Sequence, residues 1–238
     1  MTTADSPQRA DGWTAAVRQR LGLGRLLPLG GPGDGTWIAE RAAAAVLRDA
    51  ATGSGAVLGK LRIGPVDPDT APAPATDGPT VVPAPPSAYP AGQLRIEAEF
   101  SAMTDQPLPA AAEDLRAVLL DTARERLGMV VTEVDLRVTE LLDTAPEPAA
   151  AATPSEVRAA RTDGVAATAA AAVPGVVALT GVLGSPVHTG EDHVRVEVAT
   201  AGNHRALDVA LAVRTAVTAA VEGHPPVGVL ITAVVAPV

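Results

Sequence analysis

Hydrophobic and polar residues alternate strictly in two segments of the chain. In residues 94–101, Leu, Ile, Ala and Phe occupy one set of alternate positions, and Arg and Glu lie between them. Residues 130–142 show the same alternation. This pattern predicts strands that have one face on a core and the other in water. Both segments are therefore expected in a sheet whose second face is solvated and charged.

Helical periodicity is found before the first of these strands and between the two. In residues 110–127 apolar residues recur every four positions, and Gly128 ends the pattern in the way that many helices end. The elements predicted for this half of the chain are helix 36–50, strand 56–63, strand 94–101, helix 110–127 and strand 130–142. Their order is α-β-β-α-β.

The second half of the chain repeats that order. Its predicted elements are helix 155–173, strand 176–183, strand 193–200, a helix after Gly202 that ends at Val221, and strand 227–235. AAAAV occurs at Ala42–Val46 and again at Ala169–Val173, in the first helix of each half. A repeated order of elements with matching local sequence predicts a tandem duplication. The fold class expected is α+β, with two two-layer units that each carry a three-stranded sheet and helices on one face.

Composition divides the chain further. Residues 1–35 are interpreted as an N-terminal amphipathic arm and a glycine-rich connector, in which the glycines fit no phosphate-binding spacing. Residues 36–142 form the first unit, within which the proline-rich residues 65–93 are expected to be a disordered insertion. Residues 143–154 are interpreted as a linker, and residues 155–238 as the second unit.

Strand 227–235 is apolar at nearly every position, so its two faces are both expected to be covered. The second cover is predicted to be either the other half of the chain or another protomer. Leu230 and Val234 are therefore candidate partner-binding residues. On this interpretation Leu230→Glu is expected to disturb assembly before it disturbs folding.

The N-terminal arm supplies the other candidate contacts. Trp13, Val17 and Leu21 recur at four-residue spacing, which places them on one face of a predicted helix with arginines away from it. Such a segment either packs on its own domain or docks on a partner or a membrane surface. The pattern leaves both alternatives open.

Charge and composition exclude several functions. The formal net charge of −9 opposes binding to nucleic acid or anionic lipid. The chain has no cysteine, which excludes disulfides, thiolate metal sites and a cysteine nucleophile. The cluster His188–His193 is interpreted as a polar turn and not as a metal site. No catalytic signature is found, so neither catalytic nor cofactor-binding nor metal-binding residues are assigned.

The chain is expected to be cytoplasmic and to lack a membrane span. Residues 1–12 have neither the basic start nor the apolar run of a secretory signal. The uncharged run 164–187 is rich in Ala, Thr and Gly and is interrupted by Pro174 and Gly175, which favours a buried helix followed by a strand.

Residues 173–176 read VPGV at the end of an alanine-rich helix, before the pattern strand, helix and closing strand. In this respect residues 155–238 resemble the alkaline shock protein/Gls-type general stress family, and residues 36–142 resemble it more faintly, as a degenerate tandem. One departure is that the closing strand carries Leu230-Ile231 where the family usually has Asn-Val.

The resemblance implies a non-enzymatic bacterial scaffold of envelope stress response and homeostasis. Such proteins self-associate, need no cofactor, and are held at the inner face of the membrane by an anchored partner. One lysine against seventeen arginines indicates a GC-rich, actinobacterial source. The alternative is a nucleic-acid-binding module, because RNA-binding domains use similar two-layer topologies. A small-molecule enzyme would instead require a pocket of converging polar groups.

Overall fold

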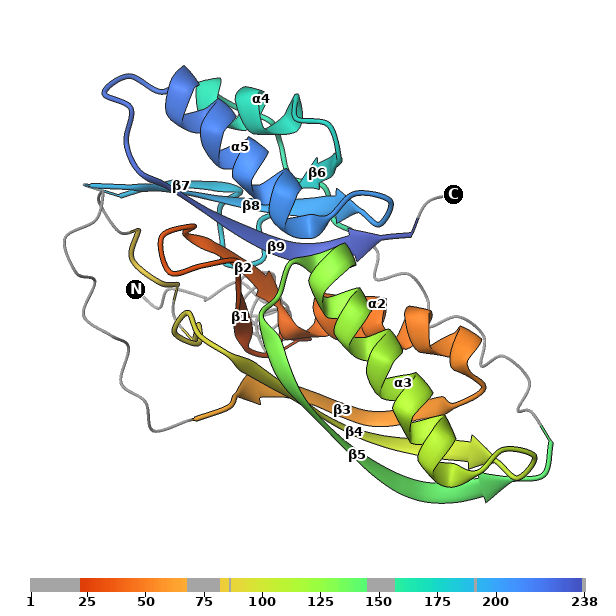
Figure 1. Ribbon diagram of the computed structural model, residues 1–238. Coiled ribbons are helices and arrows are strands. Elements are labelled where there is room, and N and C mark those ends of the chain that lie inside the picture. Colours follow the sequence, from red (N-terminus) through yellow and green to blue (C-terminus); the bar gives the residue numbers. More distant parts are fainter. Residues whose placement is uncertain (1–21, 68–81, 86, 145–156, 191, 237–238) are drawn as a thin grey trace, which may run out of the picture.

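The computed structural model describes residues 22–67, 82–85, 87–144, 157–190 and 192–236 (Figure 1). The first half contains β1 (Leu26–Leu29), β2 (Thr36–Ala39), α2 (Glu40–Ala51), β3 (Val57–Pro65), β4 (Leu94–Met103), α3 (Leu108–Thr122) and β5 (Val131–Leu142). A 3-10 turn (Thr52–Ser54) follows α2, and a π-helical turn (Ala123–Leu127) follows α3. The second half contains α4 (Val165–Ala171), β6 (Val176–Leu179), β7 (Val187–Thr189), β8 (Val194–Ala201), α5 (Ala206–Ala220) and β9 (Val227–Val235).

The predicted α+β class and repeated α-β-β-α-β order are confirmed. The units are α2-β3-β4-α3-β5 and α4-β6-β8-α5-β9, and the second unit carries the additional short strand β7 between β6 and β8. The middle strand, β4 or β8, pairs antiparallel with β3 or β6 and parallel with the last strand, β5 or β9. The two units therefore share strand order and strand direction as well as the sequence of elements.

The N-terminal segment corrects the predicted connector. Residues 26–29 and 36–39 form an antiparallel hairpin, and β2 then pairs parallel with β9. The second sheet consequently has the order β1-β2-β9-β8-β6, with β7 also paired to β8. The predicted helix 36–50 was wrong over its first four residues because Trp37 and Ile38 extend this sheet, and α2 begins at Glu40. Arg214 of α5 fixes the hairpin turn by donating to two of its carbonyl oxygens at 2.8 Å.

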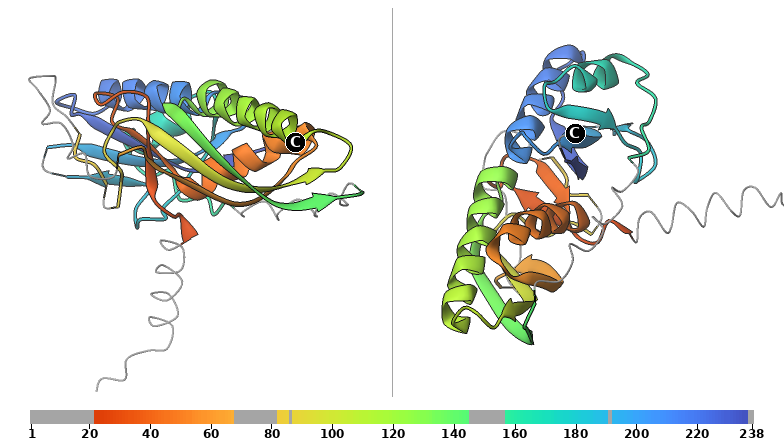
Figure 2. Two further views of the ribbon diagram at one scale, coloured as in Figure 1. Left: turned by 60° about the horizontal axis from the view of Figure 1, so that its bottom comes forward. Right: turned by 90° about the vertical axis from the view of Figure 1, so that its right-hand side faces the viewer.

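Strand β9 is covered on both faces by its own chain. Helix α5 packs on one face and α2 lies against the other (Figure 1). In the right-hand view of Figure 2, α2 lies between the two halves of the molecule. Helix α2 thus lies between the β9 sheet and the β3-β4-β5 sheet, and α3 packs beside α2 on the β3-β4-β5 sheet. The prediction of helices on one face holds for β3-β4-β5 and was wrong for the sheet of the second unit, because α2 contributes to two layers.

Part of the proline-rich insertion is ordered, which corrects the prediction for residues 82–85 and 87–93. Val82 is 5% exposed. It fills a space beside Gly35 and Gly228, where an added Cβ atom would meet its side chain at 3.3 and 2.8 Å. The backbone N–H of Tyr89 donates to the carbonyl of Leu26 at 2.9 Å. The prolines prevent a helix in this segment, but an extended chain can still form backbone hydrogen bonds along one of its edges, as Tyr89 does with β1. Residues 68–81 lie outside the described residues.

The first helix of the second unit is shorter than predicted. It begins at Val165 because Gly164 has a positive φ of 93°, and residues 157–163 have no regular structure. At its other end Gly175 of the VPGV motif also has a positive φ, and an added Cβ there would lie 2.7 Å from Val209 of α5. No helix within the described ranges is long and apolar enough to cross a membrane. The predicted linker lies outside them, apart from residues 143 and 144.

Glu40 links the two sheets at the start of α2. One oxygen of its carboxylate accepts the backbone N–H of Arg25, beside β1, and the other accepts that of Ile63 in β3, both at 3.2 Å. A single carboxylate thus satisfies two backbone donors from different layers, and hydrogen bonds to charged groups are among the stronger ones.

We expect Glu40→Gln to lower the free energy of unfolding by about 2 kcal/mol, because the amide accepts at only one of its two ends. Urea denaturation followed by circular dichroism measures this loss. Glu113→Gln, at an exposed position of α3, is the matched control and should change stability by less than about 0.5 kcal/mol. Equal stability of the two variants would contradict a linking role for Glu40.

Candidate functional site

No helix of the described residues packs on one face of the β3-β4-β5 sheet, and this face is hollowed and charged. Its concavity has a volume of about 710 Å³. Five basic and four acidic side chains line it; they are Arg25, Lys60, Arg62, Arg95, Arg137, Glu40, Glu97, Glu99 and Asp135. We call these nine residues the charged face.

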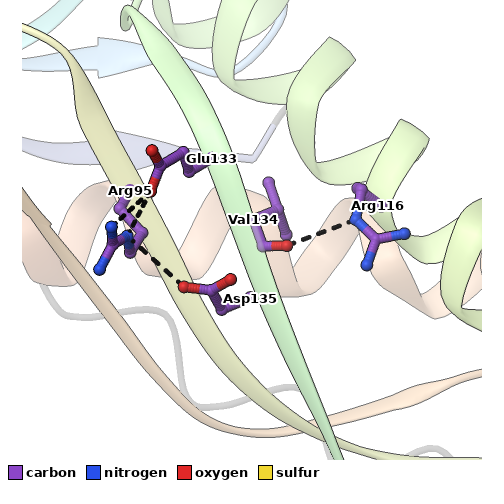
Figure 3. A network of polar contacts seen from close by, with 5 residues as sticks. All are labelled: Arg95, Arg116, Glu133, Val134 and Asp135. Carbon is purple, nitrogen blue, oxygen red and sulfur yellow. Dashed lines mark hydrogen bonds and ion pairs between the residues drawn. The ribbon is translucent and has the colours of Figure 1, made fainter. Parts of the chain in front are cut away.

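Arg95 lies near the start of β4, the middle strand of the charged face. Its guanidinium contacts the carboxylate of Glu133 at 2.5–2.6 Å and that of Asp135 at 3.4 Å (Figure 3). The hydrogen bond with Glu133, followed by the Coulombic attraction of that carboxylate, raises the pKa of Arg95. These groups lie on adjacent parallel strands, where Arg95 pairs in register with Glu133. The charges on this face are therefore ordered by ion pairs between neighbouring strands.

One end of the charged face is closed by residues from outside the sheet. The guanidinium of Arg25 lies 5.7 Å from the ring centre of Tyr89, within the range of cation–π contacts. Both residues line the concavity together with Glu40. The end wall thus combines an aromatic ring, a guanidinium and a carboxylate that come from three separate segments.

This arrangement offers alternating donors and acceptors over a wide, open surface. Such a surface favours ion pairs and hydrogen bonds with a partner of mixed charge, and charge patterning of this kind contributes specificity and association rate more than affinity. Among the residues that the structure describes, no three His, Asp or Glu side chains are close enough to hold a metal ion.

The residues predicted from sequence as partner contacts lie elsewhere. Leu230 is fully buried inside this chain, so it has no surface left for a second protein. This corrects the assignment of Leu230 as a partner contact. Of the two covers predicted for β9, the structure shows the other half of the chain, through helix α2. Val234 is half-buried and packs against the core. Trp13, Val17 and Leu21 lie outside the described residues.

The segment His188–His193 lies at the predicted turn between strands, although residue 191 is outside the description. Nδ1 of His193 and the carboxylate of Asp192 are 2.8 Å apart. This hydrogen bond lowers the pKa of Asp192. The contact joins two neighbours in the chain and closes a turn in which the N–H of Gly190 donates to the carbonyl of His193.

Sequence patterns located only part of the charged face. Alternation predicted that residues of β4 and β5 face water together. It missed Arg25 and Tyr89 because both fall in segments interpreted as connector or disordered insertion. The signal that could have found them was the apolar run at residues 26–29, which is too hydrophobic for a solvated connector.

Comparison with family models, with curated proteins and with solved structures finds no match to this chain. The likeness to the alkaline shock family therefore remains a sequence-based prediction.

Proposed function

We propose that this protein is a non-enzymatic scaffold that binds protein partners through the charged face. The observation that carries the proposal is the exposure of this hollowed face across all three strands of one sheet, opposite a face packed on α2 and α3. A surface of this breadth suits recognition of another macromolecule, in which many paired charges set orientation and specificity.

The construction of the molecule supports this role. The charged face is backed by a core of fully buried side chains that includes Ile96, Phe100 and Leu115. Its end wall is fixed to the second unit through the hairpin β1-β2 and strand β9. A partner would therefore meet a surface that is already ordered, which reduces the entropy lost on binding.

The biological setting follows from the sequence resemblance. We propose action in bacterial envelope stress and homeostasis, in the cytoplasm beside the membrane, with self-association and a membrane-anchored protein as partners. The basic residues Lys60 and Arg62 suit contact with an acidic segment of that partner, and Glu97 and Glu99 suit a basic one.

Reversing two charges on β3 tests the proposal. In the native host, Lys60→Glu with Arg62→Glu should reduce recovery of crosslinked partners about tenfold, because two attractive contacts become repulsive. Quantitative mass spectrometry measures recovery, and viability after alkaline shock measures function. The matched control is Arg158→Glu with Arg161→Glu, which makes the same charge change at exposed residues outside the face.

Equal recovery and equal survival for both double variants would refute the scaffold role of the charged face. The purified protein should also give no change in fluorescence anisotropy with labelled RNA or DNA at low salt. Nucleic-acid binding that the β3 double variant abolishes would instead establish the alternative function, with the same basic residues acting on phosphates.

A further inference from the structure

The outer edge of β5 is the longest open strand edge in the described part of the chain. β5 has 12 residues and pairs on one side with β4, while no described strand pairs with its other side. Val138 and Leu141 in this strand are exposed by 39% and 53%. An open edge with exposed apolar side chains is a template for a further strand.

The structure identifies which residues of β5 direct their backbone N–H and C=O groups to the open edge. Arg116 lies on α3, and its Nε donates to the carbonyl oxygen of Val134 at 3.3 Å (Figure 3). This carbonyl points away from β4. Alternate residues of a strand direct their N–H and C=O groups to the same edge. The register with β4 is unbroken over residues 133–138, so Leu136 and Val138 also direct their groups outward.

Charges on the same strand distinguish between possible registers. Asp135 and Arg137 flank Leu136 and both belong to the charged face. Consider β5 paired antiparallel with the β5 strand of a second copy, related by a two-fold axis. An axis at Asp135 would place that carboxylate opposite its own copy, and an axis at Arg137 would place two guanidinium groups together. Pairing about Leu136 instead places each Asp135 opposite an Arg137, which is the favourable cross-strand arrangement.

We propose that β5 pairs antiparallel with the β5 strand of a second copy of this chain, with Leu136 at the two-fold axis. Asp135 then faces the partner's Arg137, and Val134 faces the partner's Val138. The N–H of the partner's Val138 takes the place of Arg116 at the Val134 carbonyl. A continuous six-stranded sheet results, and the two charged faces become one surface.

This inference deepens the self-association within the proposed function. A scaffold with two copies of the charged face side by side would bind a partner with two contact segments more tightly than one copy does. The tests below use the purified full chain without a partner. A protein that stays monomeric would refute the β5 pairing, whereas the scaffold role is decided separately by the β3 double variant.

Disulfide trapping tests the position of the axis. The chain has no cysteine, so Leu136→Cys introduces the single thiol. Across the axis the two Cα atoms would lie about 5.5 Å apart, within the span of a disulfide. Mild oxidation should convert most of the variant to covalent dimer on a non-reducing gel. Val165→Cys, at a position 63% exposed on α4, is the control and should give at least tenfold less. Equal yields would overturn the proposal.

A charge exchange tests the register by a second route. Sedimentation velocity should show a concentration-dependent dimer in the wild type. Asp135→Arg should raise the dimer dissociation constant about tenfold, because two symmetric ion pairs become repulsive contacts. Asp135→Arg combined with Arg137→Asp should restore wild-type association, since both pairs are reversed together. Failure of the double variant to recover, or an unchanged single variant, would overturn the proposed register; circular dichroism checks that each is folded.

Discussion

Replacing Leu230 by glutamate should unfold this protein. Leu230 is fully buried in β9, beside Trp37 in β2 and Glu197 in β8. The new carboxylate would be buried, in register with the carboxylate of Glu197, and neither face of the strand is open to water. A buried unpaired charge destabilises by more than about 4 kcal/mol, a large share of the total stability of a typical domain.

Circular dichroism and gel filtration of the purified variant measure this outcome. Leu108→Glu, at a position 36% exposed in the first turn of α3, is the matched control and should alter stability by less than about 0.5 kcal/mol. A Leu230→Glu variant that keeps its circular dichroism spectrum and loses only a partner would contradict the buried position of this side chain. It would reinstate the interpretation of Leu230 as a partner contact.

Gly128→Ala should cause the second large loss of stability, at the junction of the two units. Gly128 has φ of 86°, and its carbonyl accepts the N–H of Gly30 in the hairpin turn at 3.0 Å. An added Cβ would lie 2.9 Å from Cδ2 of Leu207 in α5 and closer still to its Cβ. Left-handed strain and overpacking together should lower the free energy of unfolding by about 3 kcal/mol.

Gly55→Ala separates strain from crowding. Gly55 also has a left-handed φ, of 73°, but nothing lies within 4 Å of an added Cβ. It should therefore lose only about 1 kcal/mol, the cost of the backbone conformation alone. Thermal denaturation of both variants gives the comparison. Equal losses at the two glycines would show that Leu207 moves aside and that the two units are loosely packed at this junction.

The predicted repeat was correct where the evidence was local. Alternation in β4 and β5, four-residue spacing in α3, and Gly128 after it are properties of neighbouring residues, and the structure follows them. The same alternation placed the charges of these two strands on a solvated face. Helix 155–173 was overextended because the alanine-rich pattern continues across Gly164, whose positive φ delays the helix to Val165.

Sequence alone thus determined the α+β class, the repeated order of elements and the charged character of one sheet, because periodicity reports on each element's own two faces. Tertiary structure alone decided which surfaces cover each other. The residue pattern of the short apolar strand β2 does not indicate that it pairs with β9. Nor does the pattern of α2 indicate that this helix packs against two sheets. Such pairings depend on shape complementarity between segments far apart in the chain. For that reason Leu230 became core, Val82 filled the space beside two glycines, and the edge of β5 was left open.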